Sequence, residues 1–283
     1  MPTIAIIAAL FVCFWIIERL TPLRNAKAKL FSRLMINVLL SGMSFLVAVT
    51  LVKPVALKMM DWSASAPFGV IHLFSAPGWL KAIVAFLLMD LAFYYWHVLN
   101  HKVPLLWRFH NVHHMDPDLD VSTGFRFHFG EVVFSTAFRI VQVAAIGVPF
   151  GVFAAYELVF QANTLFHHGN VRLPIRLERA LNKILVTPRM HGIHHSQVHD
   201  ETDSNYSVVF SWWDRIHRTL GLNVPQQKIT IGVPGYSLPS DNSVWNALTF
   251  PFNRQRDYWK NPDGKVVERN PADKQGNPHY LAE

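Results

Sequence analysis

The sequence predicts an all-α integral membrane protein with about four transmembrane helices and a helical, His-rich metal-binding cap on the cytoplasmic side. Hydrophobic residues make up 51% of the 283 positions and charged residues only 16%, which is apolar for a soluble enzyme. The apolar residues gather in long runs, and many of the 15 histidines gather in short motifs. The single cysteine, Cys13, excludes a disulfide within the chain and a cysteine-based metal site.

The predicted membrane helices follow from runs that approach the roughly 20 mostly apolar residues needed to cross a bilayer. Residues 3–17 and 34–52 carry no charge, and residues 82–99 carry only Asp90. Residues 132–168 are interrupted by Gly147-Val-Pro-Phe-Gly151, which predicts a hairpin of two apolar helices. Because the first run lacks a basic leader and a clear cleavage site, we expect a retained anchor rather than a signal peptide.

The distribution of basic residues predicts the orientation. The connection after the first run carries five of them: Arg19, Arg24, Lys27, Lys29 and Arg33. Residues 53–81 are longer and poorer in positive charge, so the first connection is expected in the cytoplasm and the N-terminus outside. The second span would cover about 34–55, and Asp61–Trp79 would form an external loop. Every His cluster then lies at the cytoplasmic face of a bacterial inner membrane or an ER-type membrane.

Histidines recur at spacings that place them on one face of a helix. His97 and His101 are four residues apart, and the pattern HxxHH occurs at His110–His114 and again at His191–His195. The composition predicts only about 0.04 chance occurrences of HxxHH, so two copies are a strong signal. Residues three and four apart share a helix face, and neutral imidazole is the commonest side-chain metal ligand. The motifs therefore predict a metal site.

Ten histidines are candidate metal ligands, and His167 competes with its neighbour for one position. They are His97, His101, His110, His113, His114, His167, His168, His191, His194 and His195. All except His167 are also the catalytic candidates. A structural zinc ion takes four ligands, so the set is too large for one closed ion. Two ions with open positions suit iron and dioxygen, and the ligand types equally allow zinc in a purified sample.

Metal-bound histidines usually donate their second ring N–H to a carboxylate or a carbonyl. Seven residues are candidates for such support around the ligands: Asp90, Asp116, His128, Glu131, Asn170, Asp200 and Asn205. For each acid the alternative is a solvated surface position. Glu131 could instead cap the apolar helix that it opens.

The ordered motifs of residues 80–220 resemble a known family. They are His97-Val-Leu-Asn-His101, Trp107-Arg-Phe-His110-Asn-Val-His113-His114, Phe125-Arg-Phe-His128, Phe166-His-His168-Gly-Asn170, Thr187-Pro-Arg-Met-His191-Gly-Ile-His194-His195, and Asn205-Tyr with Ser211-Trp-Trp-Asp214-Arg. This set resembles the fatty acid hydroxylase and sterol desaturase superfamily of membrane di-iron oxygenases. The resemblance implies that the nine catalytic candidates hold two irons, which use O2 and two external electrons to hydroxylate or desaturate a lipid.

The resemblance also implies partners. We expect a lipid substrate from the membrane and a separate electron donor, a ferredoxin or a cytochrome with its reductase, because no fused haem-binding domain is recognisable. The formal charge of +7 would suit an acidic donor and equally follows from the positive-inside rule. Nothing indicates a nucleic-acid partner.

Three regions are expected along the chain: an N-terminal transmembrane region (1–79), a catalytic domain (80–220) and a cytoplasmic tail (221–283). Within the tail, Val224–Tyr236 predicts a short strand or hairpin, and Ser243–Phe250 an amphipathic helix lying on the membrane. The polar end carries no evident chemistry, so removing residues after about 255 is expected to matter little.

Two other functions could use clustered histidines. A haem-binding electron carrier needs isolated His pairs deeper in the spans, and a metal transporter needs ligands across the bilayer midplane. A thermolysin-like zinc hydrolase needs an HExxH motif, which the sequence lacks. Hydroxylation and desaturation both remain open, as does the lipid: a fatty acyl chain, sterol, alkylglycerol, carotenoid or aminolipid.

Overall fold

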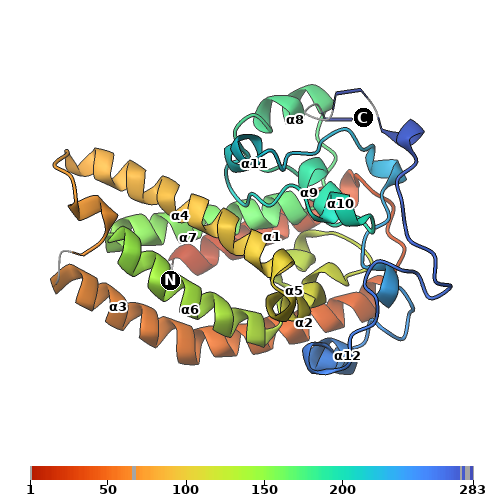
Figure 1. Ribbon diagram of the computed structural model, residues 1–283, viewed down its shortest axis with the longest axis horizontal. Helices are drawn as coiled ribbons and strands as arrows, with labels where there is room; N and C mark the ends of the chain where they lie inside the picture. The colour runs from red at the N-terminus through yellow and green to blue at the C-terminus, as the bar shows by residue number, and fades with distance from the viewer. Residues whose placement is uncertain (1, 66–67, 275, 278–280, 283) are drawn as a thin grey trace.

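The computed structural model describes residues 2–65, 68–274, 276–277 and 281–282. Regular secondary structure in these residues is helical, and β-pairing is limited to four isolated bridges. Figure 1 shows long helices running along the long axis of the molecule, with the short helices gathered at one end. This end, the cap, contains α5 (Pro104–His114), α8 (Ile175–Leu181), α9 (Pro188–His194), α10 (His199–Thr202), α11 (Trp212–His217) and α12 (Val244–Thr249). The predicted all-α class is confirmed.

The long helices supply the predicted apolar spans. They are α1 (Pro2–Leu20), α2 (Leu30–Val47) with its continuation α3 (Lys53–Ser65), α4 (Gly78–Lys102), α6 (Phe129–Ile146) and α7 (Phe150–His168). Among the described residues, four stretches are long and apolar enough to cross a membrane: Thr3–Leu20, Leu30–Met59, Gly78–Lys102 and Phe129–Ile146. Only 6% of the first is buried inside the protein, which leaves its apolar surface for lipid. The chain is an integral membrane protein.

The predicted hairpin joins α6 to α7. Gly147 ends α6 in the left-handed region, with φ of 79°, and Pro149 precedes the first turn of α7. The turn lies against Gly69, where a Cβ would approach the backbone N of Gly147 to 2.4 Å. The loop after α3 and the α6–α7 turn therefore meet at the end of the molecule away from the cap. α7 is not among the four apolar stretches, since polar residues such as Gln161 and Asn163 interrupt it.

The second span is longer than the sequence predicted. A π-helix, η1 (Ala48–Val52), connects α2 to α3, so the helix runs on to Ser65 instead of ending near residue 55. Pro54 lies in the first turn of α3, where its missing N–H and its ring are accommodated by the wider turn before it. The predicted external loop is correspondingly shorter and contains one turn of 3-10 helix, Val70–His72. Ala66 and Pro67 lie outside the described residues.

The strand predicted at Val224–Tyr236 is wrong. This segment contains two 3-10 turns, Gln226–Lys228 and Pro234–Tyr236, and a single bridge between Ile231 and Ser196. Its apolar residues pack into the cap with Leu119 and Ile193 instead of pairing along a sheet. The helix expected at 243–250 is present as α12, which buries Ala247 and packs on α2. Its attachment to the membrane stays a prediction.

The end of the chain packs on the cap rather than hanging free. Leu281 is buried with Val186, Met190 and Leu222, and the Trp259 ring stacks on Trp107. These contacts argue against the expectation that residues after 255 matter little, because they cover the helices that carry histidines. The division into three regions stays a prediction.

Candidate metal centre

Nine of the ten candidate ligands lie in two groups within the described residues. The five-histidine group contains His97, His101, His110, His114 and His194, and the four-histidine group contains His113, His168, His191 and His195. In each group one ring nitrogen per residue lies within 4.8 Å of every other. His167 belongs to neither group, although its ring centre lies 4.1 Å from that of His191. Of the doublet, the structure therefore brings His168 to the candidate ligands.

Four helix ends position these rings. α4 contributes His97 and His101 one turn apart, and the last turn of α7 contributes His168. The HxxHH motifs lie on α5 and at the end of α9, and each divides between the groups. This division follows from helix geometry, because the fourth and fifth residues of such a motif point in directions about 100° apart.

The ring nitrogens form an arrangement that neutral imidazoles alone cannot satisfy. In the four-histidine group, Nε2 of His168 lies 3.1 Å from Nε2 of His113 and 3.0 Å from Nε2 of His191. A neutral imidazole has one N–H, and in His113 and His168 it is on Nδ1, which donates to the carbonyls of Arg126 and Thr164, so the two Nε2 atoms face each other as acceptors. In the five-histidine group, the buried Nε2 atoms of His101, His110 and His114 have no hydrogen-bond partner among the described residues. A cation at each convergence point would satisfy them, so the residues fit a pair of metal ions.

Burial keeps the rings uncharged, which is the form that binds metal. It lowers the pKa of His194 to about 3, with the hydrogen bond to Ser204 opposing and the neighbouring His110 adding to the shift. Burial, followed by the neighbouring imidazoles, also lowers the pKa of His114, His191 and His195 well below the usual value. Protons therefore do not compete with a cation here at neutral pH.

The other ring nitrogen is held mainly in the five-histidine group. Nδ1 of His97 lies 2.7 Å from the Tyr206 carbonyl, and Nδ1 of His194 lies 2.7 Å from the Ser204 carbonyl. Nδ1 of His110 lies 2.8 Å from a carboxylate oxygen of Glu131. Glu131 is thus the predicted supporting acid that contacts a candidate ligand directly, and it fixes the His110 ring with Nε2 toward the group.

The other predicted acids lie elsewhere. Asp90 accepts hydrogen bonds from Tyr156, Trp213 and the Phe210 backbone N–H, so it ties α4 to α7 and to the cap instead of supporting His97. Asp116 pairs with Arg33 from α2 at 2.9 Å. Asp200 is exposed and has no polar partner within the described residues. None of these three acids contacts a candidate ligand in the structure, because each meets a donor from another segment or meets solvent.

The three remaining candidates organise the chain around the ligands. His128 accepts from the Gly130 N–H through Nδ1 and thereby caps α6. Asn170 bonds both backbone groups of Arg24, which attaches the α1–α2 connection to the end of α7. Asn205, with φ of 55°, donates to the Met190 carbonyl next to His191. All three act on backbone and not on a candidate ligand.

Sequence reasoning missed the loop that holds the five-histidine group. Asp214 accepts from the backbone N–H groups of Tyr206 and Ser207 at 2.8 and 2.9 Å. These bonds hold the 204–207 loop so that two of its carbonyls face His97 and His194. Every residue has a backbone carbonyl, so no sequence signal marks these two, whereas Asp214 belongs to the motif Ser211-Trp-Trp-Asp214-Arg.

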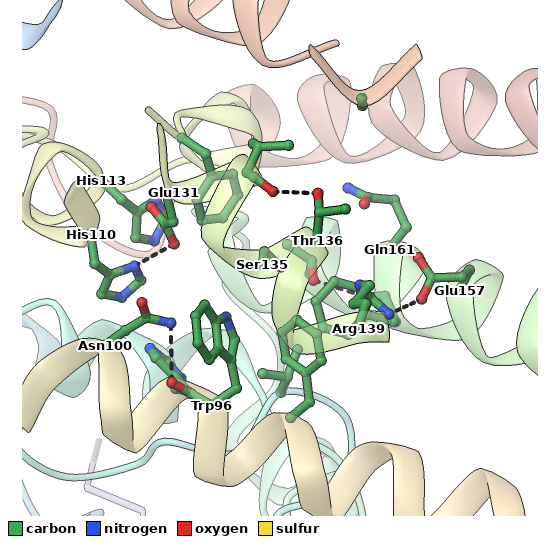
Figure 2. Close-up of a pocket in the computed structure, with 18 of the residues that line it drawn as sticks. Trp96, Asn100, His110, His113, Glu131, Ser135, Thr136, Arg139, Glu157 and Gln161 are labelled. Atoms are coloured by element: carbon green, nitrogen blue, oxygen red, sulfur yellow. Dashed lines mark hydrogen bonds and ion pairs between the residues drawn. The ribbon is translucent and has the colours of Figure 1, made fainter. Parts of the chain in front are cut away.

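A cavity of about 310 Å³ opens beside both groups. His97 and His110 of one group and His113, His168 and His191 of the other line it. From there it extends between α4, α6, α7 and the π-helix, within the layer of apolar spans (Figure 2). Phe93, Trp96 and Phe160 form apolar walls. Such volume is typical of a small-molecule site, and here it extends from the histidines along the apolar helices.

These features define a class: a helical membrane protein whose buried histidines can hold two metal ions beside a cavity within the membrane layer. Residues 82–219 match the fatty acid hydroxylase family, and this region of the chain is similar to the fatty acid hydroxylase and sterol desaturase superfamily. The resemblance inferred from the motifs is confirmed.

Curated relatives are similar to part of the chain. The chain is 32% identical over 156 residues to an ornithine lipid hydroxylase, OlsE, of Rhizobium tropici, which covers 55% of this chain and 46% of the relative. It is 30% identical over 149 residues to the human alkylglycerol monooxygenase, covering 53% and 32%. It is 29% identical over 142 residues to the mouse cholesterol 25-hydroxylase, covering 49% and 46%. The chain thus spans between about a third and about half of these relatives. No solved structure matched it.

Proposed function

We propose that this protein is a membrane-bound non-haem di-iron oxygenase that uses O2 and two external electrons to hydroxylate a lipid, with desaturation as the alternative outcome. The observation that carries the proposal is the cavity: residues of both histidine groups line it, and it leads into the layer of apolar helices. A hydrocarbon can therefore reach both groups without entering water. When bound, two irons would supply the activation of O2 needed to attack a C–H bond.

The chain's own residues would do the remaining work. The nine grouped histidines would hold the irons, and Glu131 would accept a hydrogen bond from the Nδ1–H of His110 and keep that ring oriented. The aromatic walls at Phe93, Trp96 and Phe160 would exclude water from the reacting carbon. A haem carrier fits less well, because ring nitrogens about 3 Å apart leave no room for a macrocycle between them.

The relatives favour hydroxylation. The ornithine lipid, alkylglycerol and cholesterol enzymes are named as hydroxylases or monooxygenases, which are oxidoreductases acting on lipids. Their substrates differ from one another, so they support the reaction class more than any one lipid. The positive first connection supports a cytoplasmic position for the histidines, where a ferredoxin or a cytochrome could deliver electrons.

The test is expression in a lipid-rich host together with a redox donor, followed by comparative lipidomics of wild type and His113→Ala. A lipid that gains one oxygen only with the wild type supports hydroxylation, and a lipid that loses two hydrogens supports desaturation. Identical lipid profiles with a working donor would contradict both. A Soret band in the purified protein would favour the haem carrier.

A further inference from the structure

An ion pair lies within the membrane layer, away from the histidines. Arg139 on α6 and Glu157 on α7 are the charged residues of the run 132–168, and they pair with each other. Figure 2 shows them at the opposite end of the cavity from His110, His113 and Glu131. Arg139 lies eight residues beyond Glu131 on α6, about 12 Å along the helix. Charged residues inside membrane spans are costly and are usually functional.

Polar groups connect this pair to the histidines. Ser135 lies one turn from Arg139, and Gln161 lies one turn from Glu157. Both line the cavity, and their side chains have no hydrogen-bond partner among the described residues. Figure 2 shows Ser135 and Thr136 between the ion pair and the histidine end, and Gln161 beside the pair. The lining of the cavity therefore combines these polar side chains with the apolar Ala48, Val52 and aromatic rings.

The cavity does not end at the ion pair. A second chamber of about 390 Å³ continues beyond it, lined by apolar residues that include Leu57, Ile140, Val143 and Phe153. Arg139, Glu157, Thr136, Ala48 and Val52 line both chambers. The Arg139–Glu157 ion pair thus lies where the cavity beside the histidines meets the second chamber. The π-helix that contributes Ala48 and Val52 is a distortion often found at functional sites.

A purely structural role does not account for this position. A buried ion pair contributes little net stability compared with apolar residues of the same size, so stability alone gives no reason to keep one beside a cavity. The Glu157 side chain is 35% exposed, and it lines both chambers. Arg139 is also held over the rings of Phe93 and Phe160, at 4.7 and 5.4 Å. The guanidinium is thereby fixed, while the carboxylate keeps lone pairs free for a ligand.

We propose that Arg139 and Glu157 form a binding subsite for a hydroxyl or amide group that lies between two apolar segments of the lipid substrate. The two charges cancel, so the subsite suits a neutral group that can donate to Glu157 and accept from Arg139. One apolar segment would extend to the histidines and the other would fill the far chamber. This proposal rests on the proposed function, because it takes the ligand of the subsite to be the lipid substrate of the oxygenase.

The test measures binding without turnover, on the purified protein with its metals, under argon and without an electron donor. The probes are three lipids of equal chain length: an alkane, a secondary alcohol with the hydroxyl in mid-chain, and an amide with the linkage in mid-chain. We expect the wild type to bind the alcohol and the amide about tenfold more tightly than the alkane, the effect of one hydrogen bond to a charged group.

The double variant Arg139→Met/Glu157→Leu should bind the three probes with similar affinities, since it removes both charges and leaves no unpaired partner. The matched control is Ile140→Ala, which enlarges the far chamber beside Arg139 and should weaken all three probes by the same factor. Equal affinities of the wild type for amide and alkane would overturn the subsite whether or not the double variant folds. A folded double variant that still prefers the alcohol and the amide to the alkane would also overturn the subsite. Neither result depends on catalysis, so each is distinct from failure of the lipidomic test.

Discussion

The two histidine groups differ in how their rings are held. In the five-histidine group, the Nδ1 atoms of His97, His110 and His194 face Tyr206, Glu131 and Ser204, which come from segments other than the ligand helices. In the four-histidine group, Nδ1 of His113 lies 3.3 Å from the Arg126 carbonyl, Nδ1 of His168 bonds to its own helix at Thr164, and Nδ1 of His191 and His195 has no partner in the described residues. Other segments thus hold three rings of the five-histidine group but only one ring of the four-histidine group.

This difference indicates that the two groups would tolerate change unequally. The five-histidine group has one more candidate ligand and more partners that fix ring orientation, so losing one member leaves a set that can still surround an ion. The four-histidine group has no spare member. Because both groups line the same cavity, activity should need both while metal retention should differ between them.

The largest expected effect is that of His195→Ala, which leaves three imidazoles in the four-histidine group. We expect loss of activity and retention of roughly one metal ion per chain, because even changes to residues that merely support ligands lower metal affinity by about 10- to 100-fold. His101→Ala, which leaves four imidazoles in the other group, should keep clearly more metal. Elemental analysis of both variants, with the exposed His199→Ala as control, makes the comparison. Equal metal contents in His195→Ala and His101→Ala would contradict the expected difference in metal retention between the two groups.

Glu131→Gln should have the next largest effect, and it should be confined to the five-histidine group. The amide keeps the size of the side chain but removes the charge that accepts from His110, so metal affinity of this group should fall by about 10- to 100-fold. Competition with a chelator should show one faster phase of metal release. Asp200→Asn, at an exposed acid, is the matched control and should release metal like the wild type. An unchanged release profile for Glu131→Gln would mean that the carboxylate does not orient the ligand.

The sequence was sufficient to predict the histidine motifs because their geometry is local. Residues three and four apart meet on any helix, so His97 with His101, and each HxxHH motif, could be recognised without the fold. The four apolar spans follow from composition in the same way. The division into two groups could not be predicted, because it depends on how the ends of α4, α5, α7 and α9 converge.

The partners of the acids could not be predicted either. Asp116 follows a ligand motif closely, yet it pairs with Arg33 from a distant helix, while Glu131 reaches His110 from 21 residues away. Nothing local distinguishes the two. The strand prediction failed for a similar reason: Ile229 and Ile231 have β-propensity, but a packing surface at Leu119 and Ile193 lies opposite them.

The tail of the chain provides two smaller tests. Leu281→Ala empties a buried position against Met190 and Val186, which lie on or next to α9, and should lower the free energy of unfolding by about 2–5 kcal/mol. α9 carries ligands of both groups, so the variant should speed metal release from both alike. Thermal unfolding and chelator release measure the two effects. A protein as stable as the wild type would support the sequence-based expectation that the end of the chain matters little.

Arg269→Ala should have the smallest effect, and it should distinguish the groups. Arg269 bonds both carboxylate oxygens of Glu201 at 2.8 Å, and Glu201 precedes the loop whose carbonyls hold His97 and His194. Losing these largely buried charge-assisted bonds should lower the free energy of unfolding by about 1.5–3 kcal/mol. Metal release should quicken only in the five-histidine group, because the four-histidine group takes no ring orientation from this loop.

Lys265→Ala, which removes an exposed lysine near the same end of the chain, should change neither the free energy of unfolding nor the rate of metal release. Faster release from the four-histidine group instead would show that the tail supports α9 as a whole and that the loop does not orient one group independently.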